Sequence, residues 1–145
     1  MRQELAENIY QQCPLIYRGR HQGPDKNLMC FGFECGSGWY DLILTLSVQI
    51  EQLTEKLRDE GVEPDYLPMV TQVKEKYGGL RFYLTVSTDK MDELIGQAEE
   101  DSMRICEECG AEGKLMVAYG RFLTTCCEMH RIPGVPYNEA DDEDE

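Results

Sequence analysis

The sequence is short of histidine, of basic residues and of long apolar stretches. Only two of its 145 residues are histidine, and its 28 acidic residues outnumber the 14 lysines and arginines. No run approaches the roughly 18 apolar residues that a membrane-spanning helix needs. The polar opening Met1–Glu7 also lacks the apolar stretch of a secretion signal. These absences argue against a membrane protein and a secreted one, so we expect a cytoplasmic location and no membrane partner.

The net charge of the chain is strongly negative. It amounts to −14, and six of the last seven residues, 139–145, are acidic. Because runs of like charge repel one another and stay solvated, we expect residues 133–145 to form an acidic disordered tail. Negative charge of this size opposes binding to phosphate backbones and favours a protein partner with a basic surface.

Seven cysteines in a chain without a secretion signal indicate free, buried or metal-bound thiols in a reducing compartment. Four residues have the spacing of a zinc site: Cys106-x₂-Cys109, seventeen intervening residues, then Cys127-x₂-His130. Zinc prefers four thiolate or imidazole ligands in a tetrahedron. Gly110 directly after the first pair lets a tight knuckle close around the sulfurs. We therefore predict one Zn²⁺ ion bound by these four side chains.

The zinc is expected to be structural, because four protein ligands leave no open position for water. Lys114–Thr125 should form a hairpin with its turn at Gly120, which gives the order of a treble clef: knuckle, hairpin, ligands on a short helical turn. Cys126 is an alternative ligand, but Cys127 is preferred because it forms the x₂ pair with the histidine. The other histidine, His21, has no evident link to this site.

The remaining pattern predicts an α+β fold with a long central helix packed on a β-hairpin. Apolar residues recur at helical spacing, and Gly78-Gly79 separates two strand-like runs. The expected helices cover residues 1–13, 39–60 and 89–105, and the expected hairpin pairs 70–77 with 80–86. We expect residues 1–105 to form the body and residues 106–132 a zinc-binding module packed on it.

A turn at Gly78-Gly79 fixes the expected register of the hairpin. Its cross-strand pairs are Tyr77 with Leu80, Glu75 with Phe82, and Val73 with Leu84. The opposite face then carries the one basic cluster of the chain: Lys74, Lys76, Arg81 and Tyr83. This face is interpreted as a nucleic-acid or partner surface, as a set of internal ion pairs with Glu99, Glu100 and Asp101, or as an ordinary solvated face.

Two further motifs precede the long helix. The loop Gly36-Ser37-Gly38 resembles an anion-binding helix start, but no lysine follows in the manner of a phosphate-binding loop, so we do not expect phosphate there. Cys30 and Cys35 lack a second pair for a metal site and are interpreted as buried thiols. Ser37 is expected to cap the helix and Gly61 to end it.

Three segments together resemble a group of small uncharacterised proteins of bacteriophages and prophages: residues 32–43, residues 72–83, and the C-terminal cysteine–histidine motif. The resemblance covers roughly residues 30–130. It implies a phage source, and therefore the cytoplasm of a host cell, but no mechanism.

No catalytic constellation is evident in the sequence, so we expect a non-enzymatic phage accessory protein that binds a host protein. Its acidic surface would compete with nucleic acid and so inhibit a nucleic-acid-handling or defence system of the host. The alternative is a nucleic-acid-binding regulator that uses the basic hairpin face and the zinc module.

Overall fold

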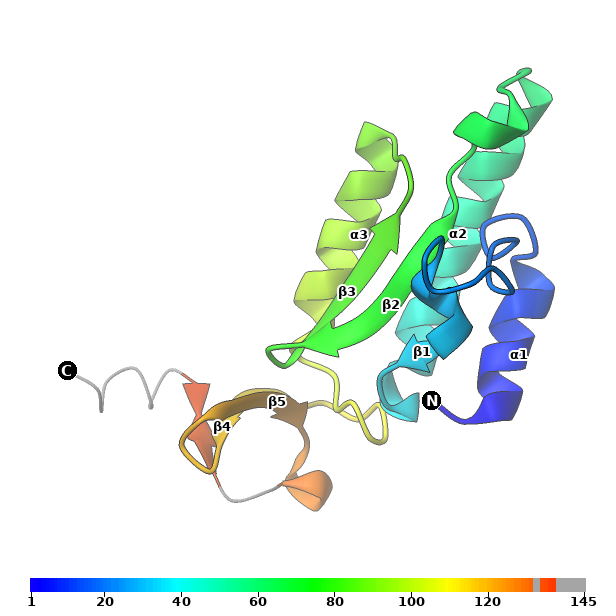
Figure 1. The fold of residues 1–145 in the computed structure, drawn as a ribbon. Coiled ribbons are helices and arrows are strands. Elements are labelled where there is room, and N and C mark those ends of the chain that lie inside the picture. The colour runs from blue at the N-terminus through cyan, green and yellow to red at the C-terminus, as the bar shows by residue number, and fades with distance from the viewer. Residues whose placement is uncertain (132–133, 138–145) are drawn as a thin grey trace.

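The computed structural model, which describes residues 1–131 and 134–137, has an α+β architecture with helices packed on a first sheet and a second, smaller sheet below it (Figure 1). The α-helices are α1 (Gln3–Gln12), α2 (Tyr40–Asp59) and α3 (Asp89–Ser102). The first sheet contains β1 (Phe33–Glu34), β2 (Val70–Lys76) and β3 (Gly79–Leu84) in the order β1-β2-β3. The second contains β4 (Lys114–Ala118), β5 (Phe122–Cys126) and β6 (Gly134–Pro136) in the order β5-β4-β6.

The long helix α2 forms for the predicted reason, a stripe of apolar residues at helical spacing. Ile43 and Ile50 are fully buried in a core that also contains the apolar face of the first hairpin. Gly61, with a φ of 95°, follows the end of the helix as predicted. Ser37 does not cap it: a 3₁₀ turn over Ser37–Trp39 precedes α2, and the Ser37 hydroxyl accepts a hydrogen bond from the backbone N–H of Arg2.

The first hairpin exists, but its predicted register is wrong by two residues. The turn is Tyr77-Gly78, and both residues have positive φ, of 55° and 82°. Gly79 is therefore free to pair with Lys76 in the ladder, and Val73 lies opposite Phe82. A shift of two residues keeps every side chain on its expected face, so the apolar face still packs into the core.

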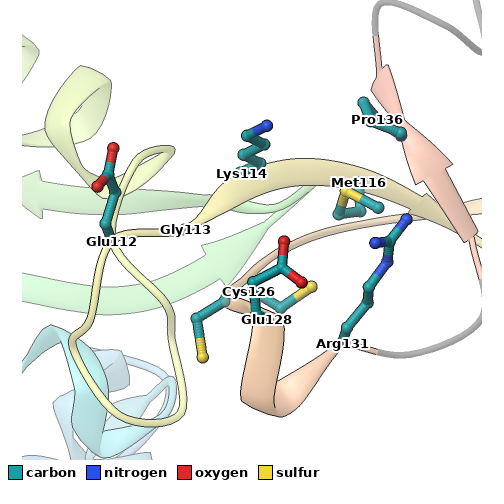
Figure 2. A pocket seen from close by; sticks show the side chains of 9 residues that line it. Glu112, Gly113, Lys114, Met116, Cys126, Glu128, Arg131 and Pro136 are labelled. Atoms are coloured by element: carbon teal, nitrogen blue, oxygen red, sulfur yellow. The ribbon is translucent and has the colours of Figure 1, made fainter.

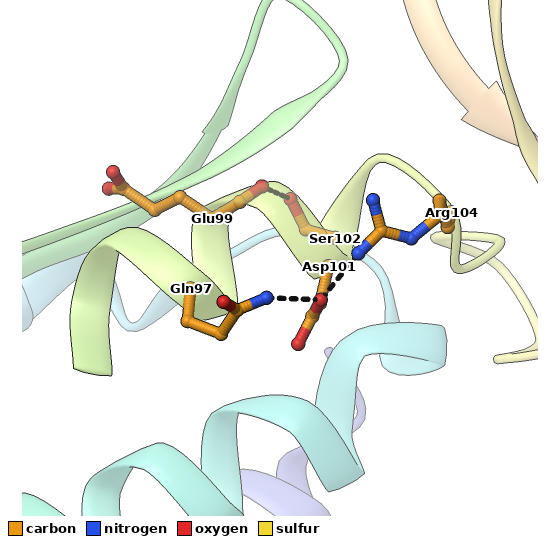
Figure 3. A network of polar contacts seen from close by, with 5 residues as sticks. All are labelled: Gln97, Glu99, Asp101, Ser102 and Arg104. Atoms are coloured by element: carbon orange, nitrogen blue, oxygen red, sulfur yellow. Dashed lines mark hydrogen bonds and ion pairs between the residues drawn. The ribbon is translucent and has the colours of Figure 1, made fainter. Parts of the chain in front are cut away.

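Helix α3 covers the outer edge of β3, which would otherwise expose unpaired amides. The N–H of Leu80 donates to the Ser102 hydroxyl at 2.9 Å, and the N–H of Phe82 donates to the Glu99 carboxylate at 3.2 Å. Figure 3 shows these two side chains on the last turns of α3, where Ser102 also donates to the Glu99 carbonyl. The edge of the first sheet is therefore closed.

The loop between α1 and the first sheet is held by a buried carboxylate. Glu51 on α2, only 3% exposed, accepts hydrogen bonds from the backbone N–H groups of Leu15 and Ile16. Desolvation raises the pKa of Glu51, and these two donors oppose that rise. Tyr17 lies beside them and shares a hydrogen bond with Ser47.

The C-terminal module docks on the body through the segment that precedes α2. The indole N–H of Trp39 donates to the Ile105 carbonyl at 2.9 Å, and the N–H of Gly38 donates to the Glu107 carbonyl at 2.7 Å. At the first hairpin, the Thr125 hydroxyl donates to the Gly78 carbonyl at 2.7 Å. Figure 1 shows the turn of that hairpin lying against the second sheet.

The expectation of a disordered segment from residue 133 onward is wrong for β6, which pairs antiparallel with β4 and places Met116 opposite Pro136. The central strand β4 needs a partner on each side to satisfy its backbone groups, and the residues after the metal ligands supply the second one. The acidic run 139–145 lies outside the described residues. None of the helices in the described part of the chain has the length and apolar composition that crossing a bilayer requires.

We expect Gly38→Ala to lower the free energy of unfolding by about 1–3 kcal/mol, the usual cost of overpacking. A Cβ at this position would lie 2.1 Å from the Cys106 carbonyl oxygen. The matched control is Gly96→Ala in α3, where a Cβ meets nothing within 4 Å. Because alanine favours helix over glycine, this control should gain about 1 kcal/mol. Urea unfolding followed by circular dichroism measures both, and equal effects would contradict the close docking at Gly38.

Candidate metal centre

Three cysteines and one histidine converge at one point of the C-terminal module. The ligand atoms of Cys106, Cys109, Cys127 and His130 all lie within 4.8 Å of one another. The first two come from the loop after α3, the third follows β5, and the histidine ends a 3₁₀ turn over Glu128–His130. The predicted order of knuckle, hairpin and short helical turn is confirmed.

The distances between the ligand atoms fit a tetrahedral metal ion. Around a zinc ion with ordinary bond lengths, two sulfurs lie about 3.8 Å apart, and a sulfur and an imidazole nitrogen about 3.6 Å apart. The Cys109 and Cys127 sulfurs are 3.6 Å apart. The Nδ1 atom of His130 lies 3.3 Å from the Cys127 sulfur and 3.8 Å from the Cys106 sulfur. The four residues can therefore hold one ion with little rearrangement.

The knuckle closes as its glycine suggests. Gly110 has a φ of 83°, and its N–H donates to the Cys106 carbonyl at 2.9 Å. The next N–H, of Ala111, points at the Cys109 sulfur at 3.5 Å. A side chain at position 110 would also approach the Gly38 carbonyl of the body. Gly110 is therefore needed twice: its positive φ closes the knuckle, and its lack of a side chain lets the knuckle approach the body.

The environment of Cys127 favours the thiolate, the form that binds metal. Desolvation raises the pKa of Cys127, but the backbone N–H groups of His130 and Met129 and the thiols of the site lower it further, so the net shift is downward. The pKa of Cys109 is raised: the Ala111 N–H lowers it, whereas desolvation and the neighbouring thiols outweigh that effect. A cation at the centre would stabilise all three thiolates.

The structure places Cys127, and not the adjacent Cys126, in the metal-binding cluster, as predicted from the spacing. Cys127 belongs to the cluster, whereas Cys126 is the last residue of β5 and lies opposite Lys114. Cys126 lines a cavity of about 280 Å³ beside the metal ligands. Figure 2 shows Arg131 extending beside Met116 there, with Pro136 on the neighbouring strand β6.

The glycine loop before α2 does bind an anion, but the anion is a side chain of the same protein. The N–H of Gly36 donates to the Glu107 carboxylate at 2.9 Å. Desolvation raises the pKa of Glu107, and the Gly36 hydrogen bond opposes this rise. Glu107 lies inside the knuckle, between two metal ligands. The local pattern of the loop does not reveal this ligand, because the contact joins residues 71 positions apart.

The basic cluster of the first hairpin is present as a surface, with one change caused by the register. Lys74 lies opposite Arg81, whereas the register expected from a Gly78-Gly79 turn would have placed Lys76 there. Of the three interpretations of this face, the one with internal ion pairs is contradicted: Glu99 accepts the Phe82 amide, and Asp101 binds Arg104 at 2.6 Å on its own helix (Figure 3). Over residues 1–131 and 134–137, no carboxylate lies within 4.0 Å of the three cationic groups of the cluster, and Tyr83 is 40% exposed beside them.

Comparison of the chain with protein-family models, with curated proteins and with solved structures finds no match. The resemblance to phage proteins therefore stays a prediction.

We expect the freshly reduced protein to contain one metal ion per chain, measured by elemental mass spectrometry. Cys127→Ser should lose the ion, because it removes one of the four ligands, whereas Cys126→Ser should keep it. Cys109→Ser should unfold the C-terminal third, visible as loss of amide protection in hydrogen exchange after residue 105. This ligand assignment would be contradicted if the wild-type protein contained no metal, or if Cys126→Ser and Cys127→Ser lost the ion equally.

Proposed function

We propose that this chain is a non-enzymatic phage accessory protein that binds a basic host protein and that carries a structural Zn²⁺ ion in its C-terminal module. By occupying a surface that normally receives nucleic acid, it would inhibit a nucleic-acid-handling or defence system of the host. The observation that carries the proposal is the charge of helix α3, next to a metal centre whose shell is already full.

Zinc is the metal that the ligand set favours. Thiolate and imidazole ligands in a tetrahedron suit Zn²⁺, and three sulfurs exclude the hard cations that prefer oxygen. Four protein ligands leave no position for a substrate or an activated water, which supports a structural role. In zinc-finger peptides such binding contributes roughly 10–16 kcal/mol, enough to stabilise a module with few buried residues of its own.

Helix α3 concentrates negative charge on one exposed surface. Six of its fourteen residues are acidic, and Lys90 is the single basic one. Asp89, Asp92, Glu93 and Glu100 are exposed. A helix presents such charges at regular spacing along one exposed side, which suits recognition of a basic groove. The two other acids, Glu99 and Asp101, contact the Phe82 amide and Arg104. Among the exposed acids, Asp92 accepts the Ser87 hydroxyl and Glu93 lies 3.8 Å from Lys90 on the same helix.

We expect the double change Glu93→Gln and Glu100→Gln to slow association with the host partner several-fold, because it removes steering charge from α3 without touching the core. The partner is first isolated from nuclease-treated host lysate with the tagged protein. Biolayer interferometry at low and moderate salt then measures association rates.

The matched control is Glu60→Gln with Glu63→Gln, which removes the same charge from exposed positions after α2. It should leave the association rate nearly unchanged. Equal rates for the wild type and the α3 variant at low salt would overturn the proposed surface. Loss of all partners on nuclease treatment would overturn the protein-binding function.

A nucleic-acid-binding regulator is the second candidate, and it is favoured by one observation. Lys74 and Arg81 lie directly opposite each other, and like charges in that position destabilise a sheet unless an anion lies between them. If this function is correct, the affinity for nucleic acid should fall steeply as the salt concentration rises. The double change Lys74→Gln with Arg81→Gln should also weaken binding.

A further inference from the structure

The turns of the two hairpins share one unusual feature, although the first loop has two residues, 77–78, and the second has three, 119–121. Each has tyrosine followed by glycine at its centre, and all four residues have positive φ: 55° for Tyr77, 82° for Gly78, 52° for Tyr119 and 72° for Gly120. Two consecutive positive φ values are the signature of a type I′ turn, whose first central position favours Asn, Asp or Gly. Among the described non-glycine residues, only these two tyrosines have positive φ.

Neither tyrosine is buried, so packing of the side chain does not compensate for the unfavourable backbone conformation. Tyr77 and Tyr119 are each 66% exposed. A bulky side chain in the left-handed region crowds its own backbone, so asparagine or glycine would suit the fold better. Strain of this kind, held at an exposed aromatic residue, points to a role outside folding.

Cationic side chains lie next to aromatic rings at both turns, and the second turn has a further ring, that of Phe122. The Lys76 ammonium lies 5.4 Å from the centre of the Tyr77 ring, and Lys74 and Arg81 follow along the same hairpin. At the second turn, the Arg121 guanidinium lies 5.7 Å from the centre of the Phe122 ring, which is 60% exposed. Aromatic rings interleaved with lysine and arginine are the pattern of single-strand binding surfaces.

The first turn lies against the second hairpin. A Cβ on Gly78 would lie 2.4 Å from a Leu115 methyl and 3.2 Å from the Thr124 amide nitrogen. Residues 70–86 carry a net charge of +2 and residues 110–131 of +1, in a chain whose total is −14. Positive charge is therefore gathered on the two hairpins, the first of which is packed along β3 against the acidic helix α3.

We infer that the two tyrosine–glycine turns form a binding surface for single-stranded nucleic acid. Tyr77 and Tyr119 stack on bases, while Lys74, Arg81 and Arg121 neutralise phosphates. Stacking accepts any base, so binding is largely independent of sequence, and a duplex, whose bases are already stacked, binds less well. This inference rests on the second candidate function and adds to it the groups that contact the bases.

The test measures binding of fluorescein-labelled oligo(dT) to the full-length, zinc-loaded protein by fluorescence anisotropy over a series of salt concentrations. Tyr77→Asn with Tyr119→Asn should lower the affinity about tenfold or more at every salt concentration, because stacking does not depend on counterions. The same variant should keep or raise the thermal midpoint of unfolding, since asparagine tolerates positive φ. Tyr77→Phe with Tyr119→Phe keeps the rings and should retain the affinity.

The matched control is Tyr66→Asn, because Tyr66 is 71% exposed beside Asp65 and has an ordinary backbone. Equal loss in this control, or loss accompanied by a lower thermal midpoint, overturns the inference. A different result would overturn the stacking role alone: the double asparagine variant keeps full affinity, while Lys74→Gln with Arg81→Gln loses it. The second candidate function would then still hold. No binding by the wild type at low salt overturns both.

Discussion

The docking of the metal knuckle on the glycine loop before α2 is the contact on which the architecture depends. Glu107 lies between two metal ligands and accepts the Gly36 amide through its carboxylate and the Gly38 amide through its carbonyl. No side chain fits at either glycine, because the knuckle backbone lies against both. The indole of Trp39 then completes the contact by donating to Ile105. The start of the longest helix and the metal site therefore form one unit.

In this arrangement, a metal ion bound by the four residues would take part in folding and would not be an addition to a finished domain. The module buries few residues of its own, chiefly Cys106, Met116, Cys126 and Cys127, and two of these are ligands. A core of that size does not offset the conformational entropy of the segment. A bound ion would hold the knuckle, and the knuckle positions Glu107 for the body, so metal loss should separate the module from the first sheet. Coupling of this kind between ion and fold is common in small metal-stabilised modules.

Charge is distributed unevenly over the elements of this scaffold. Helix α3 carries acids along its exposed side and also closes the edge of β3 through Glu99 and Ser102. The hairpins carry Lys74, Arg81 and Arg121 and the exposed Tyr77 and Tyr119. The acidic surface suits a basic protein and the hairpins suit an anionic strand, so the two proposed interactions need not compete for the same residues.

The sequence by itself determined what depends on local spacing: three helices, two hairpins, and the four ligands, including Cys127 in preference to Cys126. Periodicity and short-range turns carry this information, because they involve neighbours in the chain. Only the tertiary structure decided the rest. The turn moved to Tyr77-Gly78, since Gly79 is needed in the ladder, and β6 formed because β4 required a second partner. The anion of the glycine loop was Glu107, which lies far along the chain, and no local pattern encodes a contact of that length.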